Sequence, residues 1–211
     1  MNSIEIYGHH ALNFVELIAT AAFALSGVIQ AIRKRMDVVG VCACGFLAAF
    51  GGGTLRDLLI DRRPFFWVQN QYVLIAILAL CIAAFSLLKQ KYVDLTERPL
   101  QVPDAIGLGL FCATGVHLSW GMGQPPLVAI MMGVITGTFG GVLRDLVCNE
   151  IPTLFKDHRP YAVCAFVGGL TYVALKWFGA EDGIAITACA LVTTGSRALT
   201  LWLNWELPSR S

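Results

Sequence analysis

The stretch FGGGTLRD at residues 50–57 decides the fold. It lies inside residues 38–60, an apolar run long enough to cross a lipid bilayer. Each glycine disfavours a helix by about 1 kcal/mol relative to alanine, so we expect this run to break at Gly51, Gly52 and Gly53. Backbone N–H and C=O groups that lose their helical hydrogen bonds inside the membrane are tolerated only where protein surrounds them or where they line a water-filled cavity. The glycines therefore indicate a path through the membrane.

The composition is that of an integral membrane protein. Hydrophobic residues make up 56% of the 211, charged residues 14% against about 25% in a typical soluble domain, and the mean hydropathy is +0.67. The few charges give a net charge of +1, and we expect no nucleic-acid partner. The seven cysteines form no CxxC motif and the four histidines have no partner at ligand spacing, so no metal or cofactor is predicted. No apolar run carries a nucleophile with a base, which argues against an enzyme.

Apolar runs of about 20 residues, the length that a bilayer crossing demands, recur along the whole chain. They fall at residues 13–32, 37–60, 72–88, 103–120, 125–148, 161–178 and 183–204. We therefore predict seven transmembrane helices in a single membrane domain that covers residues 1–211. Nine basic residues lie in one set of loops and three in the other, which places the N-terminus outside and the C-terminus inside.

An internal repeat with an offset of 88 residues relates the two halves of the chain. The offset relates Glu16 to Asp104, Phe23 to Phe111, Ser26-Gly27 to Thr114-Gly115, Gly45 to Gly133, Gly52-Gly53 to Gly140-Gly141, Arg56-Asp57 to Arg144-Asp145 and Pro64 to Pro152. Each copy holds three spans, an odd number, so the second copy is inverted in the membrane. The predicted fold is thus an all-α membrane protein with two inverted three-helix repeats, at about 12–88 and 100–178, and a seventh helix at about 183–204.

The second copy of the glycine motif, TFGGVLRD at residues 138–145, predicts a second broken helix at Gly140 and Gly141. Carbonyls freed at Gly51, Gly52 and Gly140 are oxygen ligands suited to a monovalent cation, K⁺ or Na⁺. The N-termini of the half-helices favour an anion or a zwitterion at the same place, so both kinds of solute stay open.

Arginines at membrane depth cost at least about 2.5 to 3.5 kcal/mol, so Arg56 and Arg144 are either functional or held in structural ion pairs. Neighbouring residues on a helix point apart, and we expect no pair between Arg56 and Asp57. Glu16 and Asp104 begin the first helix of each repeat, at the depth of that repeat's arginine. This placement predicts Glu16–Arg56 and Asp104–Arg144 ion pairs, because a buried charge must be paired.

The remaining acids of the two motifs, Asp57 and Asp145, are then left to face the path. Alternatively, Asp57 caps a half-helix in a Thr54-x-x-Asp57 arrangement. The candidate pore residues are Gly51, Gly52, Gly53, Thr54, Asp57, Thr138, Gly140, Gly141 and Asp145, and the candidate structural or gating charges are Glu16, Arg56, Asp104 and Arg144.

The paired Gly-Gly-x-x-Arg-Asp motifs, the segment AFALSG at residues 22–27 and the pattern of spans resemble the bacterial branch of the trimeric intracellular cation (TRIC) channels over essentially the whole chain. The resemblance implies a homotrimer in the bacterial inner membrane, surrounded by lipid, in which each subunit conducts K⁺ between its kinked second and fifth helices. Phe139 departs from the family pattern, since a third glycine belongs there. On the residues alone a secondary transporter of a small solute fits equally well, and the resemblance also admits glycine as that solute.

Overall fold

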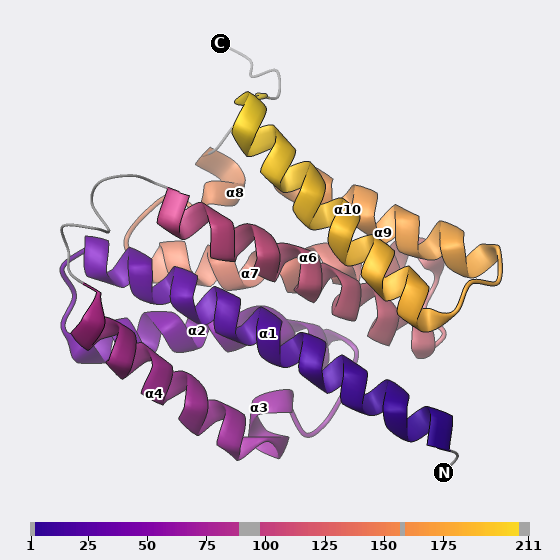
Figure 1. Cartoon of the computed structure of the whole chain (residues 1–211), viewed down its shortest axis with the longest axis horizontal. Helices are drawn as coiled ribbons and strands as arrows, with labels where there is room; N and C mark the ends of the chain where they lie inside the picture. The colour runs from indigo at the N-terminus through magenta and orange to yellow at the C-terminus, as the bar shows by residue number, and fades with distance from the viewer. Residues whose placement is uncertain (1–2, 89–97, 157–158, 207–211) are drawn as a thin grey trace.

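The computed structural model describes residues 3–88, 98–156 and 159–206, which contain helices and loops but no strand (Figure 1). The helices are α1 (Ser3–Arg33), α2 (Val38–Leu59), α3 (Phe66–Gln69), α4 (Gln71–Leu87), α6 (Arg98–Gly121), α7 (Pro126–Val147), α8 (Thr153–Lys156), α9 (Ala162–Trp177) and α10 (Asp182–Leu203). Lys89, Lys91 and Arg210, which entered the count of loop charges, lie outside the described residues, and the orientation in the membrane stays a prediction.

Local sequence signals explain where the central helices begin and end. Asp37 caps α2, because its side chain accepts a hydrogen bond of 2.8 Å from the backbone N–H of Gly40. Helix α7 begins with Pro126 at its first position, where a missing N–H costs nothing. Helix α10 ends at Asn204, whose left-handed backbone (φ 47°) stops the helix.

The two predicted helix breaks are wrong. Helix α2 runs without interruption through residues 51–53, and α7 runs without interruption through residues 140–141. No half-helix therefore exists for Asp57 to cap, and the glycines do not free carbonyls for a cation. Intrinsic propensity is a weak prior that tertiary packing overrides, and here the packing is close.

These glycines instead let α2 and α7 approach each other. A Cβ atom at Gly52 would collide with the backbone carbonyl of Thr136, and one at Gly140 would collide with the carbonyl of Ala48. Membrane helices use small residues in this way to bring two backbones together. The pairing of Gly52 with Thr136 and of Ala48 with Gly140 also means that α2 and α7 pass each other in opposite directions.

The same close contact occurs once in each half of the chain. A Cβ atom at Gly27 of α1 would lie 2.9 Å from the Cα of Gly45 in α2. A Cβ atom at Gly115 of α6 would likewise lie 2.9 Å from the Cα of Gly133 in α7. Both pairs are related by the 88-residue offset, so corresponding sequence positions make corresponding helix contacts.

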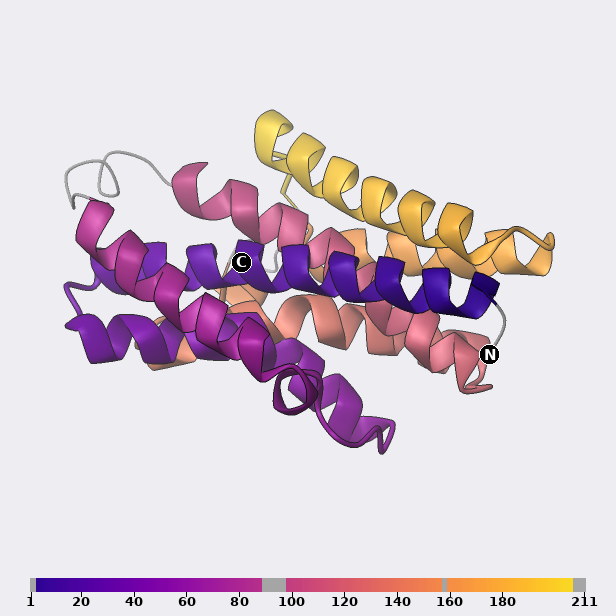
Figure 2. The ribbon, with the colours of Figure 1, turned by 60° about the horizontal axis from the view of Figure 1, so that its bottom comes forward.

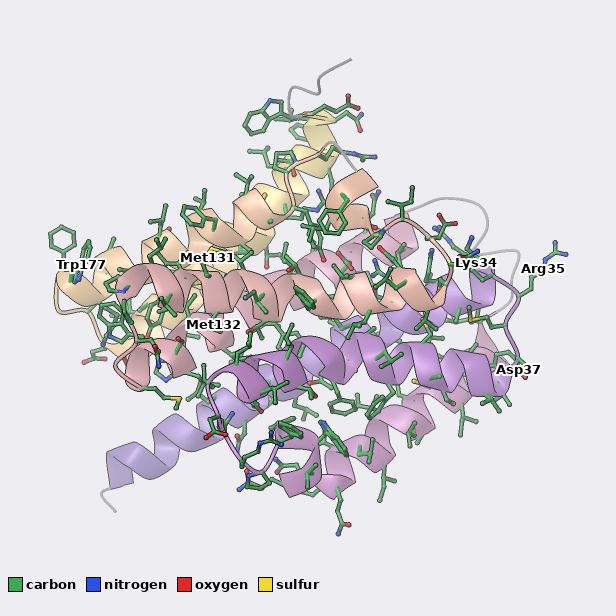
Figure 3. All side chains as sticks on the ribbon, turned by 180° about the vertical axis from the view of Figure 1, so that it is seen from behind. Lys34, Arg35, Asp37, Met131, Met132 and Trp177 are labelled. Carbon is green, nitrogen blue, oxygen red and sulfur yellow. The ribbon has the colours of Figure 1, made fainter. Side chains whose placement is uncertain are left out.

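Helices α1, α2, α6 and α7 form the centre of the molecule, and the other long helices pack on two sides of it (Figures 1 and 2). Helix α4 lies against α1 and α2, whereas α9 and α10 lie against each other and against α6. Figure 3 places Lys34, Arg35 and Asp37 at one end of the molecule and Trp177 at the opposite end. The α1–α2 connection therefore marks one end of the helix bundle.

The chain is an all-helical membrane protein. Five helical segments among the described residues are long and apolar enough to cross a membrane, namely Leu12–Arg33, Val38–Leu59, Leu100–Gly121, Pro126–Val147 and Asp182–Leu203. Helices α4 and α9 are apolar but have 17 and 16 residues, or about 25 Å against a hydrocarbon core of about 30 Å. The predicted count of seven spans depends on these two shorter helices.

Candidate functional site

The first buried charge cluster, which we call the Arg56 cluster, joins α1 to the end of α2. The guanidinium of Arg56 is fully buried, and its Nη1 lies 2.8 Å from Oε1 of Glu16. Its Nη2 and Nε contact Oδ1 of Asp57 at 2.8 and 2.9 Å. Nη1 of Arg62 lies farther from the same oxygen, at 3.6 Å. The predicted Glu16–Arg56 ion pair is confirmed.

The second cluster, the Arg144 cluster, joins α6, α7 and α1. Nη1 of Arg144 lies 2.5 Å from Oδ1 of Asp104 and also donates to the hydroxyl of Ser26, while Nε donates to Oδ1 of Asp145 at 2.8 Å. The other oxygen of Asp145, Oδ2, accepts hydrogen bonds from the backbone N–H of Thr153 at 2.7 Å and from its hydroxyl at 2.8 Å. The predicted Asp104–Arg144 ion pair is also confirmed.

The expectation that an arginine and the next residue cannot pair is wrong in both clusters. Arg56 contacts Asp57, and Arg144 contacts Asp145. That expectation describes the directions in which neighbouring side chains leave a helix, and it holds for short side chains. An arginine has a long flexible stem, so its head can fold back to a neighbouring carboxylate when burial removes water as an alternative partner.

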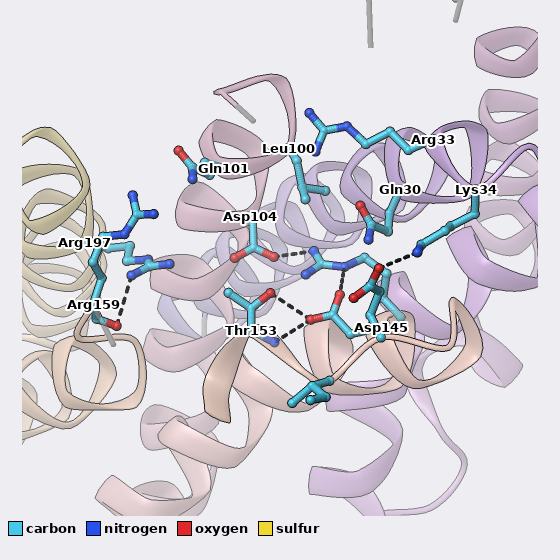
Figure 4. A pocket seen from close by; sticks show the side chains of 13 residues that line it. Gln30, Arg33, Lys34, Leu100, Gln101, Asp104, Asp145, Thr153, Arg159 and Arg197 are labelled. Atoms are coloured by element: carbon cyan, nitrogen blue, oxygen red, sulfur yellow. Dashed lines mark hydrogen bonds and ion pairs between the residues drawn. The ribbon is translucent and has the colours of Figure 1, made fainter. Parts of the chain in front are cut away.

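A cavity of about 510 Å³ opens onto the Arg144 cluster (Figure 4). Its wall combines basic, acidic and amide side chains from α1, α6, α7, α8 and α10. The lining residues are Gln30, Arg33, Lys34, Leu100, Gln101, Asp104, Arg144, Asp145, Glu150, Ile151, Thr153, Arg159 and Arg197. Among them the partly exposed Lys34 and Glu150 form an ion pair. A wall of this kind suits small charged solutes better than apolar ones.

Sequence reasoning missed most of this wall. Thr153 follows Asp145 by eight residues and belongs to no motif, so its hydrogen bonds to that carboxylate arise only from the turn into α8. Arg197 is a charge inside the apolar run at residues 183–204, and the sequence pattern does not identify its partner. In the structure its Nη1 donates to the carbonyl of Pro160 at 3.0 Å, and its guanidinium lies 4.8 Å from the centre of the Tyr161 ring.

A far smaller cavity, of about 10 Å³, adjoins the Arg56 cluster. Its lining residues are Glu16, Thr20, Ala49, Phe50, Gly53, Thr54, Arg56, Asp57, Phe66, Trp67 and Phe111. Among the described residues, nothing donates a hydrogen bond to Oδ2 of Asp57, although Asp57 is fully buried. The hydroxyl oxygen of Thr54 accepts a hydrogen bond of 3.1 Å from the indole nitrogen of Trp67.

An apolar waist lies between the two clusters. Its core is the stack of Phe23 on Phe111, whose ring centroids are 5.6 Å apart, with Ala19 and Ala48 packed beside it. Arg56 and Arg144 lie on opposite sides of the α2–α7 contact, because α2 and α7 run in opposite directions there. Because α2 and α7 are antiparallel, Arg144 lies at the level of residue 44 of α2. Arg56 is twelve residues farther along α2, so the two arginines are about 18 Å apart along the helix axis.

The remaining candidate pore residues occupy two kinds of position. The last glycine of each motif adjoins an arginine. A Cβ atom would lie 3.9 Å from Nη2 of Arg56 at Gly53 and 3.7 Å from Nη2 of Arg144 at Gly141. By contrast, Thr138 donates its hydroxyl hydrogen to the carbonyl of Val134 in its own helix, at 2.8 Å. A Cβ atom at Gly51 would meet the side chain of Leu143, so that glycine faces α7.

Comparison with known proteins finds a matching family model and similar bacterial membrane proteins. A family model described as "Glycine transporter" matches residues 13–88 and 101–177. The inner membrane protein YadS of Escherichia coli K12, of the UPF0126 group, is 37% identical over 75% of this chain and 76% of its own length. The UPF0126 membrane protein YvgT of Bacillus subtilis is 36% identical over 95% of this chain and 97% of its own.

Solved structures decide the family. The trimeric intracellular cation channel orthologue from Rhodobacter sphaeroides is 34% identical, has a TM-score of 0.83 and covers 92% of this chain and 99% of its own. The chain belongs to the bacterial branch of the TRIC family. A second structure, described as the basis for conductance through TRIC cation channels, is 31% identical with a TM-score of 0.84, covering 94% of this chain and 96% of its own.

Both charge clusters of this TRIC family member lie within the segments that the family model matches. Residues 13–88 contain the Arg56 cluster, and residues 101–177 contain Asp104, Arg144, Asp145 and Thr153. Helix α10 lies outside the matched segments, although Arg197 brings it to the wall of the large cavity. The matched segments therefore include both clusters and the waist between them.

Proposed function

We propose that this TRIC family member is a cation channel that conducts mainly K⁺, with one path in each subunit. The observation that carries the proposal is the position of the two charge clusters, which lie inside one chain on opposite sides of a single apolar waist. The solved structures it resembles are described as trimeric intracellular cation channels, which favours the channel. Asp57 and Asp145, with Thr54 and Thr138, line the proposed path.

We further propose that the path follows an inverted repeat of three spans, with α4 and α9 counted as spans and α10 as the extra helix. The repeat-related rings of Phe23 and Phe111 stack on each other, and Gly52 adjoins Gly140, as expected for residues beside a pseudo-twofold axis. Residues 12–88, 100–178 and 183–204 are then the three parts of one membrane domain. We place the N-terminus outside and the C-terminus inside, from the loop charges.

Conduction requires the waist to widen, since its side chains are packed together. The glycines at 51–53 and 140–141 are the positions where α2 and α7 bend most easily, because each glycine weakens the helix by about 1 kcal/mol relative to alanine. Bending there separates the Phe23–Phe111 stack and lets each arginine change partners. The glycines thus act as flexible points of continuous helices, and the cation is coordinated by side chains rather than by freed carbonyls.

We also propose a homotrimer in the bacterial inner membrane, without a cofactor. The word "trimeric" describes the R. sphaeroides orthologue, and "inner membrane protein" describes the E. coli relative. The exposed apolar side chains of the long helices, such as Val39, Ile75 and Leu191, suit contact with lipid or with neighbouring subunits.

Glycine transport is the second candidate, because the matching family model is described as a glycine transporter. The large cavity suits a zwitterion, since its wall presents both guanidinium and carboxylate groups. Recording from planar bilayers that contain the purified protein separates the two functions. Discrete unitary currents in KCl support the channel, whereas electrical silence together with glycine counterflow in vesicles overturns it in favour of a transporter.

A further inference from the structure

Two cysteine side chains from distant parts of the sequence meet where α7 ends. Cys44 lies on α2 and Cys148 directly follows the last residue of α7, and their Sγ atoms are 3.5 Å apart. Both side chains are buried free thiols. Two sulfur atoms at this distance are in van der Waals contact, so small side-chain rotations can bring them to the bond length of a disulfide, about 2.05 Å.

A second contact between sulfur atoms serves as a comparison within the same chain. Sγ of Cys112 in α6 lies 3.9 Å from Sγ of Cys189 in α10. Both residues lie inside membrane-spanning segments, and the thiol of Cys112 already donates a hydrogen bond of 3.2 Å to a backbone carbonyl of α9. Cys148 instead follows the spanning segment of α7 and stands two residues before the charged Glu150. A water-soluble oxidant therefore reaches Cys148 more readily than the second pair.

The redox conditions around Cys44 and Cys148 follow from their position in the molecule. Glu150, two residues after Cys148, forms an ion pair with Lys34, and Lys34 lies at one end of the helix bundle (Figure 3). We place that end inside the cell from the loop charges, and the bacterial cytoplasm keeps thiols reduced. The two cysteines are therefore thiols under ordinary conditions, and an oxidant in the cytoplasm is needed to join them.

We propose that Cys44 and Cys148 form a reversible disulfide with a peroxide as the oxidant. The thiolate of Cys148 attacks one oxygen of hydrogen peroxide, the O–O bond breaks, and a sulfenic acid and hydroxide form. The sulfur of Cys44 then attacks the sulfenic sulfur, the S–S bond forms, and the hydroxyl group leaves as water with the proton of the Cys44 thiol. The hydroxide takes up the proton that the Cys148 thiol released. Two thiols and one peroxide thus give one disulfide and two water molecules.

The bond joins the two helices that line the proposed path, so its effect on opening rests on the proposed function. Cys44 precedes the glycines of α2, whereas Cys148 follows those of α7. Because the two helices are antiparallel, both cysteines lie on the same side of the glycines, where Sγ of Cys44 is 4.0 Å from the carbonyl oxygen of Arg144. In the oxidised protein α2 and α7 cannot separate beside the Arg144 cluster, and the path stays closed.

Peptide mass spectrometry tests the bond independently of any current. The full-length protein in lipid vesicles is treated with hydrogen peroxide, the remaining thiols are blocked with N-ethylmaleimide in denaturant, and the digest is analysed without reduction. We expect a linked Cys44–Cys148 peptide that dithiothreitol separates, and its loss in Cys44→Ala and in Cys148→Ala. Cys189→Ala is the matched control, because it removes one member of the other sulfur contact, and it keeps the linked peptide.

Single-channel recording then tests the effect on opening. Peroxide is expected to lower the open fraction of the wild type and dithiothreitol to restore it, whereas Cys44→Ala and Cys148→Ala, each verified as folded by size-exclusion chromatography, do not respond. Treated wild type in which both thiols stay free, or in which Cys148 carries a sulfinic acid without a linked peptide, overturns the disulfide. A linked peptide with an unchanged open fraction overturns its effect on the path. A protein that is silent before oxidation rejects the channel, while the linked peptide by itself still supports the disulfide.

Discussion

At the scale of single residues, Arg56 and Arg144 each bind two carboxylates instead of one. Arg56 bridges Glu16 of α1 to Asp57, and Arg144 bridges Asp104 of α6 to Asp145. Removing a buried charge leaves its partners uncompensated, which costs far more than the net stabilisation that the pair provides. The clusters therefore link α1 to the end of α2 and α6 to the end of α7.

The substitution Arg56→Ala is expected to lower the free energy of unfolding by about 3 to 5 kcal/mol, because two buried carboxylates lose their counter-charge. Combining it with Glu16→Ala recovers only part of the loss, since Asp57 keeps only the more distant Arg62 as a partner. Thermal unfolding of the single and double variants measures the coupling. The partly exposed Lys34–Glu150 pair is the matched control, with a coupling of at most about 1 kcal/mol. Strict additivity of Glu16→Ala and Arg56→Ala contradicts the buried pair.

At the scale of elements, backbone meets backbone at the closest approach of α2 and α7. Gly52 and Gly140 leave no space for a methyl group, because the carbonyls of Thr136 and Ala48 occupy it. Glycine weakens each helix by about 1 kcal/mol, but it permits a close approach that larger residues would prevent. The same residues that suggested broken helices therefore hold two intact helices together.

Gly52→Ala is expected to lower the free energy of unfolding by about 1 to 3 kcal/mol, although alanine is the better helix former, because the added methyl group overpacks the contact. Gly195→Ala in α10 is the control, since a Cβ atom there meets nothing within 4 Å, and it stabilises by up to about 1 kcal/mol. Thermal melting of the two variants checks the difference. An increase in stability for Gly52→Ala is incompatible with the close contact.

At the scale of the whole molecule, the two clusters lie on opposite sides of the waist within a single chain. The cavities at the two ends differ greatly, about 510 Å³ beside Arg144 and about 10 Å³ beside Arg56. The 88-residue repeat therefore produces two ends of similar sequence and different shape. Opening the proposed path depends on the aromatic stack between them.

Phe111→Ala is expected to raise the fraction of time that single channels spend open, because the closed waist loses one ring of its stack. The change costs about 3 to 5 kcal/mol of stability, so size-exclusion chromatography must first verify the trimer. Phe14→Ala is the control, since Phe14 is 62% exposed and is not part of the buried Phe23–Phe111 cluster, and its open fraction matches the wild type. If intact Phe111→Ala trimers open and close as the wild type does, the constriction lies elsewhere in the chain.

The amino-acid sequence alone determined the membrane class, the long apolar helices and the two ion pairs. Hydropathy follows directly from composition, and the 88-residue offset carried Glu16 onto Asp104 and so named the partners of Arg56 and Arg144. A buried arginine must have a partner, which makes that part of the site readable without coordinates.

Only the tertiary structure decided whether the glycines break or join helices, because propensity describes an isolated helix and the carbonyls of Thr136 and Ala48 belong to a neighbouring one. It also decided the contact of each arginine with the next aspartate, which depends on how burial folds a flexible side chain. Thr153 became part of the site for the same reason. Its distance from Asp145 is set by the turn into α8, and no periodic pattern in the sequence encodes that turn.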